Sequence, residues 1–296
     1  MVFPDFIIGG AQKSGTTTLL RQLQKHPSIY APRQELHFFA SRNEEPMGTW
    51  ELGIEWYRRQ FPDHVAVTGE KTPNYLYNPR SPQRIYDIIP GVKLIFILRN
   101  PVDRAYSQYI MKYRNDGTRD YGSFEKAIQQ PNCEYLERGI YWKQLERYQK
   151  LFHENQMLIL VLDELKNNPK NVYHRIYDFL NVAPIYPADI NKRYYRGGQP
   201  RYETLGRIRR RIIDASSTSS SYIKMRLLHK TAYAINMVNI RGQFMEYVTG
   251  KQIKKYPPMN PKTRAQLHDY FLPHNQQLLE MYPDLPIRHW IDGGGQ

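Results

Sequence analysis

The sequence feature that most constrains the fold is a glycine-containing loop between a short apolar run and a helical pattern near the start of the chain. Residues 6–8 are apolar and end at two glycines, as a buried parallel strand does. Residues 16–26 then place three leucines on one side of a predicted helix. In such a strand, loop and helix, the loop N–H groups and the positive helix end point at one spot. The stretch therefore predicts a phosphate-type anion site.

The spacing within this loop distinguishes it from the P-loop of nucleoside-triphosphate enzymes. Gly10, Gly15 and Thr17 occupy the places of the two glycines and the final hydroxyl residue of G-x-x-x-x-G-K-[ST]. Thr16, however, takes the place of the lysine, and the only lysine of the loop is Lys13. We therefore expect an anion site that does not hold a triphosphate, with a purely structural strand–turn–helix as the plain alternative.

Apolar runs alternate with helical patterns through the first 180 residues. They predict strands at residues 6–8, 65–71, 92–98 and 157–162, and helices at 16–26, 54–61, 81–89, 101–115, 124–130, 141–153, 169–180 and 263–282. This alternation is typical of an α/β fold with a doubly wound parallel sheet, in which ligands bind outside the carboxyl ends of the strands. Lys13, Glu70 and Arg99 all fall at predicted strand ends, which favours a single site at that edge.

The strand at 92–98 is followed by a strong helix start. Asn100 can cap the helix, Pro101 suits its first position, and Asp103 places a negative charge near its positive end. The pattern predicts a helix that begins directly after Arg99 and carries Ser107 in its second turn.

Basic charge is concentrated in one part of the chain. The 296 residues carry a formal net charge of +14, and residues 192–264 alone hold 17 Lys and Arg against three Asp and Glu. The alternation of strands and helices also stops there. We therefore predict an α/β core at residues 1–191, a basic helical elaboration at 192–258 and a terminal helix at 259–296 that packs back on the core. An acidic partner is expected for the basic part.

Cysteine content and apolar runs indicate the compartment. A single cysteine, Cys133, excludes an intramolecular disulfide and gives no cluster for zinc. The start of the chain has no leader pattern, and no uninterrupted apolar run reaches about 18 residues. We expect a cytoplasmic protein, with peripheral docking on the anionic inner membrane through residues 192–255 as an added hypothesis.

Four motifs occur in order: G-A-Q-K-S-G-T-T from residue 10, E-L-H-F-F from 35, G-E-K-T-P-N-Y from 69, and L-R-N-P-V-D-R-A-Y-S-Q-Y from 98. Together they resemble the sulfotransferases that use PAPS (3′-phosphoadenosine 5′-phosphosulfate), most closely those that sulfate carbohydrates such as heparan sulfate and bacterial glycans. The resemblance covers residues 5–182 and returns more weakly at 259–290. It implies a P-loop-like three-layer fold. It also implies sulfuryl transfer from PAPS to a hydroxyl, or an amine, of a carbohydrate or related acceptor, releasing PAP and requiring no metal.

The resemblance also implies the residues that bind the donor. Gln12, Lys13, Ser14, Gly15, Thr16 and Thr17 would hold the 5′-phosphosulfate, Arg99 and Ser107 the 3′-phosphate, and Arg196 and Gly197 would belong to a later loop that closes over the 3′-phosphate. The physical chemistry agrees for the second group. A guanidinium makes paired, charge-assisted hydrogen bonds to phosphate, and a serine hydroxyl adds another.

For the chemical step, the resemblance makes Glu70 the base that takes the acceptor's proton. Burial among aromatic residues can raise the pKa of a carboxyl group to suit that role. Lys13 would neutralise charge on the departing phosphate oxygen, and Lys71 would hold either Glu70 or the sulfonate. His37 is the rival base, although its apolar and aromatic neighbours favour a hydrogen-bonded core histidine.

Two other functions fit parts of the sequence. A P-loop kinase or nucleotide hydrolase is favoured by the apolar run 158–162, which is followed by Asp163 and Glu164 and imitates a magnesium-binding strand end. It is disfavoured by Thr16 in the place of the lysine. A nucleic-acid-binding module is allowed by the basic cluster at 207–211, but no nucleic-acid motif accompanies it and we do not expect such a partner.

Overall fold

The computed structural model describes residues 2–40, 49–116, 123–192 and 258–293. The chain packs as two compact units. The first comprises Met1–Arg104, Leu136–Tyr195 and Arg264–Gln296, and the second comprises Ala105–Tyr135 and Arg196–Thr263. The predicted basic elaboration at 192–258 falls almost wholly outside the described residues, so the three-part division of the chain stays a prediction.

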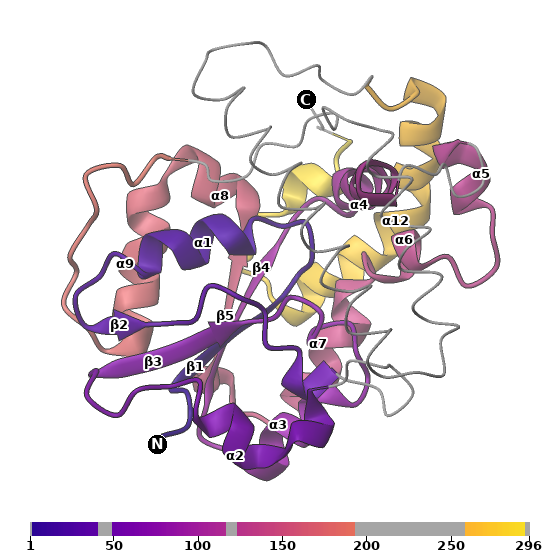
Figure 1. Cartoon of the computed structure of the whole chain (residues 1–296). Coiled ribbons are helices and arrows are strands. Elements are labelled where there is room, and N and C mark those ends of the chain that lie inside the picture. The colour runs from indigo at the N-terminus through magenta and orange to yellow at the C-terminus, as the bar shows by residue number, and fades with distance from the viewer. Residues whose placement is uncertain (1, 41–48, 117–122, 193–257, 294–296) are drawn as a thin grey trace. The chain divides into compact units, whose positions relative to one another are not determined.

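The first unit is built on a five-stranded sheet with the strand order β2-β3-β1-β4-β5 (Figure 1). The strands are β1 (Phe6–Gly10), β2 (Ile29–Tyr30), β3 (Val67–Lys71), β4 (Lys93–Leu98) and β5 (Met157–Val161). All their pairings are parallel, and β1 lies between β3 and β4, with Ile7 opposite Glu70 on one side and Leu94 on the other. The predicted α/β fold with a parallel sheet is confirmed.

Helices lie between the strands along the chain and follow the last of them. They are α1 (Thr16–Leu23), α2 (Gly53–Arg58), α3 (Ser81–Ile88), α4 (Pro101–Asp116), α5 (Phe124–Ile128), α6 (Glu134–Glu137), α7 (Tyr141–Gln149), α8 (Leu162–Asn167), α9 (Pro169–Leu180) and α12 (Pro261–Met281). The predicted helix at 16–26 ends early, because the N–H groups of Lys25 and His26 close tighter turns onto Gln22 and Leu23. The short helices α6 and α8 were not predicted. In the described part of the chain, none of the helices has the length and hydrophobicity that crossing a bilayer requires.

The predicted cap of α4 is confirmed. Asn100 Oδ1 accepts a hydrogen bond from the Val102 N–H at 3.0 Å, and the Asn100 carbonyl accepts one from the Arg104 N–H at 2.9 Å. Asp103 lies in the first turn, where a negative charge is favourable. Arg99 is therefore fixed between the end of β4 and a well-capped helix.

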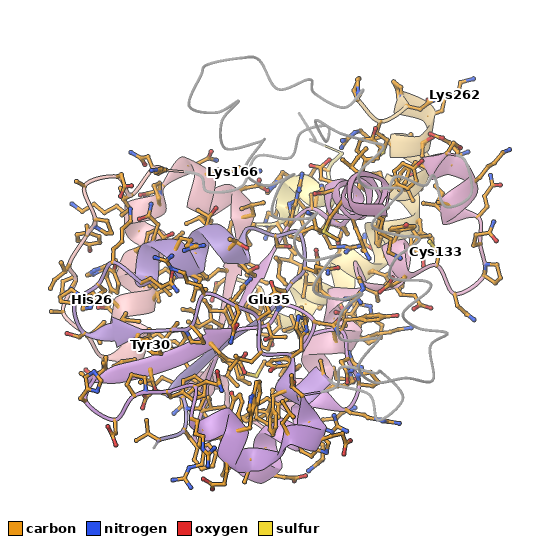
Figure 2. The ribbon with its side chains drawn as sticks, in the orientation of Figure 1. His26, Tyr30, Glu35, Cys133, Lys166 and Lys262 are labelled. Atoms are coloured by element: carbon orange, nitrogen blue, oxygen red, sulfur yellow. The ribbon has the colours of Figure 1, made fainter. Side chains whose placement is uncertain are left out.

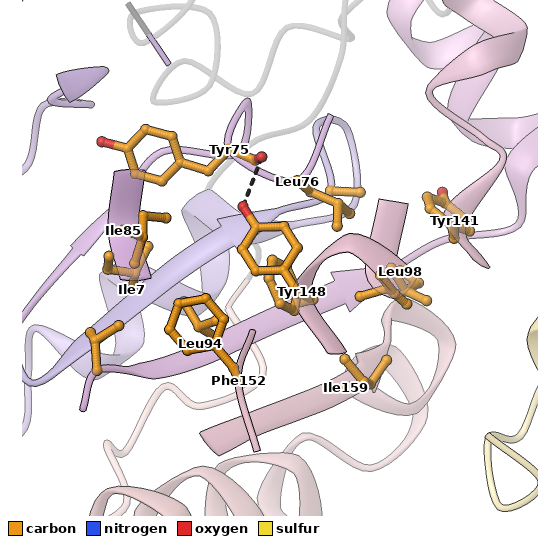
Figure 3. Packing of buried hydrophobic residues seen from close by; sticks show 14 of the residues in the cluster. Ile7, Tyr75, Leu76, Ile85, Leu94, Leu98, Tyr141, Tyr148, Phe152 and Ile159 are labelled. Carbon is orange, nitrogen blue, oxygen red and sulfur yellow. Dashed lines mark hydrogen bonds between the residues drawn. The ribbon is translucent and has the colours of Figure 1, made fainter. Parts of the chain in front are cut away.

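Alternate strand residues pack into two hydrophobic clusters, one on each face of the sheet. The cluster on the face of α2, α3 and α7 includes Ile7, Tyr75, Ile85, Leu94 and Tyr148 (Figure 3). The cluster on the face of α1 and α9 includes Ile8, Leu19, Ile95, Ile97 and Ile176. Because both faces are covered, a ligand can reach the sheet only at the ends of its strands.

Removing the buried Ile97 side chain should destabilise the fold strongly. Ile97 lies on β4 and is 0% exposed, so Ile97→Ala leaves a cavity and should lower the free energy of unfolding by about 2–5 kcal/mol. Ile185, with 46% exposure, provides a matched control, and Ile185→Ala should change stability by less than about 0.5 kcal/mol. Urea denaturation followed by circular dichroism measures both, and equal effects would contradict the assigned core.

Candidate active site

The loop of residues 11–15 joins the end of β1 to the start of α1 at the carboxyl edge of the sheet. Gly15 has a φ of 91° and directly precedes Thr16, the first residue of α1. A Cβ at Gly15 would lie 2.7 Å from Leu162 Cδ1, the end of a side chain that can move aside, so it is the positive φ that requires glycine. The first turn of α1 contains no acidic residue, so no carboxylate in that turn offsets the partial positive charge at the start of the helix.

Lys13 and Arg99 meet at this loop. Lys13 has a φ of 72°, a conformation that is uncommon for a residue with a Cβ and that clusters at functional sites. Arg99 Nη1 donates a hydrogen bond to the Lys13 carbonyl at 3.3 Å, and the Tyr141 hydroxyl donates to the Arg99 carbonyl at 2.8 Å. Among the described residues, the buried Arg99 Nε has no hydrogen-bond partner. The guanidinium therefore keeps a donor for an anion.

Backbone hydrogen bonds join the ends of three strands around the loop. After β3, the Thr72 N–H donates to the Ile8 carbonyl of β1 at 3.1 Å. After β1, the Ala11 N–H donates to the Ile97 carbonyl of β4 at 2.8 Å. The segments that carry the predicted site residues of the first unit therefore converge at one edge of the sheet.

Glu70, near the end of β3, is completely buried. Its Oε1 accepts hydrogen bonds from the hydroxyls of Tyr57 at 2.7 Å and Tyr75 at 2.9 Å, and its Oε2 accepts one from the Thr72 hydroxyl at 2.8 Å. Burial raises the pKa of Glu70, and the three hydrogen bonds reduce this rise without cancelling it. Three donors therefore occupy a carboxyl group that solvent does not reach.

Lys71 follows Glu70 in the strand and points to the opposite face of the sheet. Its ammonium, on a side chain that is only 5% exposed, forms an ion pair with Glu35 Oε1. The other oxygen of Glu35 lies 3.4 Å from His37 Nε2. In the view of Figure 2, Glu35 lies between α1 and α7. We call Glu35, His37 and Lys71 the Glu35 cluster.

The Glu35 cluster combines a fixed carboxylate with access to solvent. The side chain of Glu35 is 36% exposed. Burial raises its pKa, but the hydrogen bonds and charges of His37 and Lys71 outweigh burial and hold the pKa below the usual value for glutamate. Glu35 is therefore ionised at neutral pH and able to accept a proton from a bound molecule.

One prediction about this region is wrong, and one with two alternatives is reduced to a single alternative. His37 is not a core residue, because its side chain is 51% exposed and its φ of 55° turns the chain so that only its neighbours are buried. Lys71 does not hold Glu70, because the two side chains leave opposite faces of β3 and the ammonium pairs with Glu35 instead. A contact between Lys71 and a sulfonate stays a prediction.

Glu35 was not predicted as a site residue. The signal available in the sequence was the E-x-H spacing, which places two titratable side chains on either side of Leu36, a buried residue. Its partner Lys71 lies 36 positions further along the chain, so the pair forms only when the fold brings both segments to the same strand end.

Asp163 and Glu164 do not form the acidic strand end that a nucleotide hydrolase needs. Both lie in the first turn of α8. Asp163 pairs with Lys166 at 2.6 Å and with His289 at 3.2 Å, whereas Glu164 pairs with Arg175 at 3.1 Å. These ion pairs occupy both acids and remove the main support for a magnesium-dependent phosphoryl enzyme.

The remaining predicted donor residues lie in three places. Gln12, Ser14, Thr16 and Thr17 belong to the loop and the first turn of α1, and Ser14 is completely buried. Ser107 lies in the part of α4 that belongs to the second unit. Arg196 and Gly197 lie outside the described residues. The contacts of all these residues with a donor stay predictions.

A parallel sheet, a glycine loop at a helix start and cationic strand ends define an α/β protein with an anion site at the carboxyl edge. The chain belongs to the sulfotransferase domain family, which matches residues 3–194. The family predicted from the four motifs is confirmed, in preference to the alternative of a P-loop kinase or nucleotide hydrolase.

Individual relatives give the resemblance more detail. Human heparan sulfate glucosamine 3-O-sulfotransferase 5 is 36% identical over 192 residues, which cover 61% of this chain and 54% of that protein. Mouse bifunctional heparan sulfate N-deacetylase/N-sulfotransferase 4 is 27% identical over 319 residues, which cover 97% of this chain and 31% of that protein. The chain thus spans about half the length, or less, of these two relatives.

A solved structure shares the fold. The crystal structure of a sulfotransferase from Alicyclobacillus acidocaldarius aligns with a TM-score of 0.66 at 23% identity, over 98% of this chain and 99% of that one. At this identity the likeness concerns the fold alone.

Adding a side chain at Gly15 should disrupt the loop. Gly15→Ala is expected to weaken binding of PAP, the expected donor product, by at least about tenfold, since the new Cβ strains the left-handed backbone of the loop and pushes against the Leu162 side chain. Gly53→Ala is the matched control, because Gly53 also has a positive φ, 76°, but a Cβ there would have nothing within 4 Å. Isothermal titration with PAP measures both variants, and unchanged affinity in Gly15→Ala would contradict the loop assignment.

Proposed function

We propose that this protein transfers the sulfuryl group of PAPS to a hydroxyl or an amine of a glucosamine-containing saccharide, with release of PAP. The observation that carries the proposal is the Arg99 guanidinium beside the glycine loop: its Nη1 is bound to the Lys13 carbonyl, and its buried Nε has no hydrogen-bond partner in the described part of the chain. The family membership supports sulfuryl transfer. The saccharide comes from the relatives, whose names specify heparan sulfate and, in one case, its glucosamine.

The residues of the loop fit a donor with several negative charges. The uncapped start of α1 and the Arg99 guanidinium both offer N–H donors to anionic oxygen atoms. When bound, PAPS supplies the sulfuryl group. Lys13 would balance the negative charge that develops on the bridging oxygen as the bond from that oxygen to sulfur breaks. Ser107, Arg196 and Gly197 are proposed as further contacts of the 3′-phosphate.

On the acceptor side, Glu70 is the proposed base and Glu35 its rival. Burial raises the pKa of Glu70 toward the range that suits a base, whereas the pKa of Glu35, whose side chain is 36% exposed, is lowered. Glu70 would take the proton of the acceptor group while the acceptor atom bonds to sulfur. Lys71 and His37 contact the two oxygens of Glu35, and His37 is the other rival for the proton.

A direct assay tests the proposed activity. Purified protein is incubated with radiolabelled PAPS and three acceptors: a glucosamine–uronic acid polysaccharide, the same polysaccharide after full N-acetylation, and a simple phenol. Label in either polysaccharide with stoichiometric release of PAP supports the proposal, and the N-acetylated form separates amine from hydroxyl transfer. Label in the phenol alone would overturn the saccharide assignment, and absence of PAP release with all three would overturn the activity.

The two carboxyl groups make opposite predictions for pH dependence. With Glu35 as base, kcat/KM should fall only as the pH drops below the ordinary glutamate pKa of about 4.3, because the pKa of Glu35 is lowered. With Glu70 as base, the fall in kcat/KM should begin at a pH above that value, since burial raises the pKa of Glu70. Initial rates measured between pH 3.5 and pH 8, over a range in which the protein remains folded, show at which pH kcat/KM falls.

Substitution separates the same alternatives. Glu70→Gln keeps the size of the side chain but removes the proposed base, and kcat should fall by about 10²–10⁴-fold with little change in PAP affinity. Glu35→Gln should lower kcat by no more than about 10²-fold. A Glu70→Gln enzyme with normal kcat, or a Glu35→Gln enzyme that is the more damaged of the two, would exclude Glu70 as the base.

A further inference from the structure

Arg99 lies between two regular elements and belongs to neither of them. β4 ends at Leu98, and α4 begins at Pro101 with Asn100 as its cap. The backbone position of Arg99 is therefore not set by the strand or the helix alone. The Arg99 carbonyl accepts a hydrogen bond from the hydroxyl of Tyr141, the first residue of α7, at 2.8 Å. A side chain from a third element thus holds this backbone in place.

The start of α7 is itself packed tightly against the start of α4. Tyr141 is 1% exposed, and its ring centroid lies 6.4 Å from that of Trp290. A Cβ at Gly139 would lie 3.0 Å from Pro101 Cβ and 2.7 Å from the Phe271 ring. The absence of a side chain at Gly139 lets the two helix starts approach closely. The Tyr141 hydroxyl is therefore a donor that is held in a fixed place.

The surroundings of the Tyr141 hydroxyl keep it protonated. Burial raises the pKa of Tyr141, and this rise outweighs the lowering by Arg104, Arg99 and Ser14. The hydroxyl therefore donates its hydrogen to the Arg99 carbonyl at neutral pH. Ser14, near enough to act on that pKa, is 0% exposed, and its hydroxyl oxygen has no hydrogen-bond partner among the described residues. Tyr141 thus lies beside the glycine loop as well as beside Arg99.

The side chain of Arg99 is held at its far end by the same loop. Its Nη1 donates to the Lys13 carbonyl at 3.3 Å, whereas its buried Nε has no hydrogen-bond partner within the described part of the chain. Arg99 is thus fixed at its carbonyl by Tyr141 and at its guanidinium by the loop backbone. A shift of the carbonyl would move the Nε away from an anion bound at the loop.

We propose that Tyr141 is a positioning residue of the donor site: its hydroxyl fixes the Arg99 backbone and thereby aims the guanidinium at the 3′-phosphate of PAPS. The proposal rests on the proposed function, in which Arg99 binds that phosphate. It gives Tyr141 a role in donor recognition without contact with the donor. Because the phosphate concerned is the one on the ribose, Tyr141 helps the protein to distinguish PAPS from nucleotides that carry a 5′-phosphate only.

Tyr148 provides a matched control on the same helix. Its hydroxyl also donates to a backbone carbonyl, that of Tyr75, at 2.8 Å, and it too is 0% exposed (Figure 3). Tyr141→Phe and Tyr148→Phe therefore each remove one oxygen from a buried tyrosine of α7 and leave one carbonyl without that donor. Only the first substitution releases the backbone of Arg99.

The first test measures binding of PAP and of 5′-AMP, which lacks the 3′-phosphate, by isothermal titration. Tyr141→Phe should weaken PAP binding by about 5–20-fold and AMP binding by less than about twofold, because only the contact with the 3′-phosphate is lost. Tyr148→Phe should change either affinity by less than about twofold, although both variants should lose a similar amount of thermal stability. An equal loss for PAP and AMP, or an equal loss in the two variants, would overturn the positioning role.

A double substitution shows whether Tyr141 acts through Arg99. Arg99→Ala keeps the backbone carbonyl but removes the guanidinium, and PAP binding should weaken by at least about 20-fold. Adding Tyr141→Phe to Arg99→Ala should then change PAP affinity by less than about twofold. Additive effects of the two substitutions would overturn the proposal. An Arg99→Ala protein that binds PAP normally would instead overturn the proposed role of Arg99 itself, and with it the role of Tyr141.

Hydrogen exchange in the free protein gives a measurement that needs no ligand. The peptide of residues 98–104 includes the Val102 and Arg104 N–H groups, which bond to Asn100 directly after Arg99. Deuterium uptake by this peptide should be at least about fivefold faster in Tyr141→Phe and unchanged in Tyr148→Phe. Unchanged uptake in Tyr141→Phe would show that its hydroxyl does not fix this backbone, and would overturn the proposal whatever nucleotide the protein binds.

Discussion

The site depends on the close packing of three strand ends around β1. Side chains at Gly9 and Gly10 would collide with their neighbours, because a Cβ would lie 2.7 Å from the Phe96 ring and 2.5 Å from Leu76 Cβ. Their absence lets the neighbouring segments approach closely, so that Thr72, after β3, bonds to Ile8 of β1, and Ala11, after β1, bonds to Ile97 of β4. One edge of the sheet then carries the glycine loop, the Lys71 ion pair and Arg99, although these are far apart in the sequence.

Charge is arranged differently on the two sides of β3. Glu70 points to the face of α2, where neutral hydroxyls from Tyr57, Tyr75 and Thr72 donate hydrogen bonds to its carboxyl group. Lys71 points to the other face and pairs with an exposed acid, Glu35. A one-residue step along a strand reverses the direction of the side chain, so a single E-K dipeptide serves two separate environments.

Regular local signals account for the part of the fold and site that could be predicted. Continuous apolar runs indicated β4 and β5, the Asn100 cap fixed the start of α4, and the place of Arg99 followed from these two elements. The exposure of the His37 side chain could not be predicted from its buried neighbours, since the positive φ of His37 turns its ring away from theirs. The importance of Glu35 depends on Lys71, and no local pattern connects two residues that meet only through the order of the strands.

The opposite pKa directions of Glu35 and Glu70 distinguish the two carboxyl groups of the site. Burial raises the pKa of Glu70, and a raised pKa makes a carboxylate a stronger base. His37 and Lys71 lower the pKa of Glu35, which keeps that exposed side chain ionised. Two carboxyl groups whose surroundings move their pKa values apart are suited to two different tasks. The three hydroxyl donors also fix the orientation of the Glu70 carboxyl group, and a fixed orientation matters because small displacements of a reacting group are costly in rate.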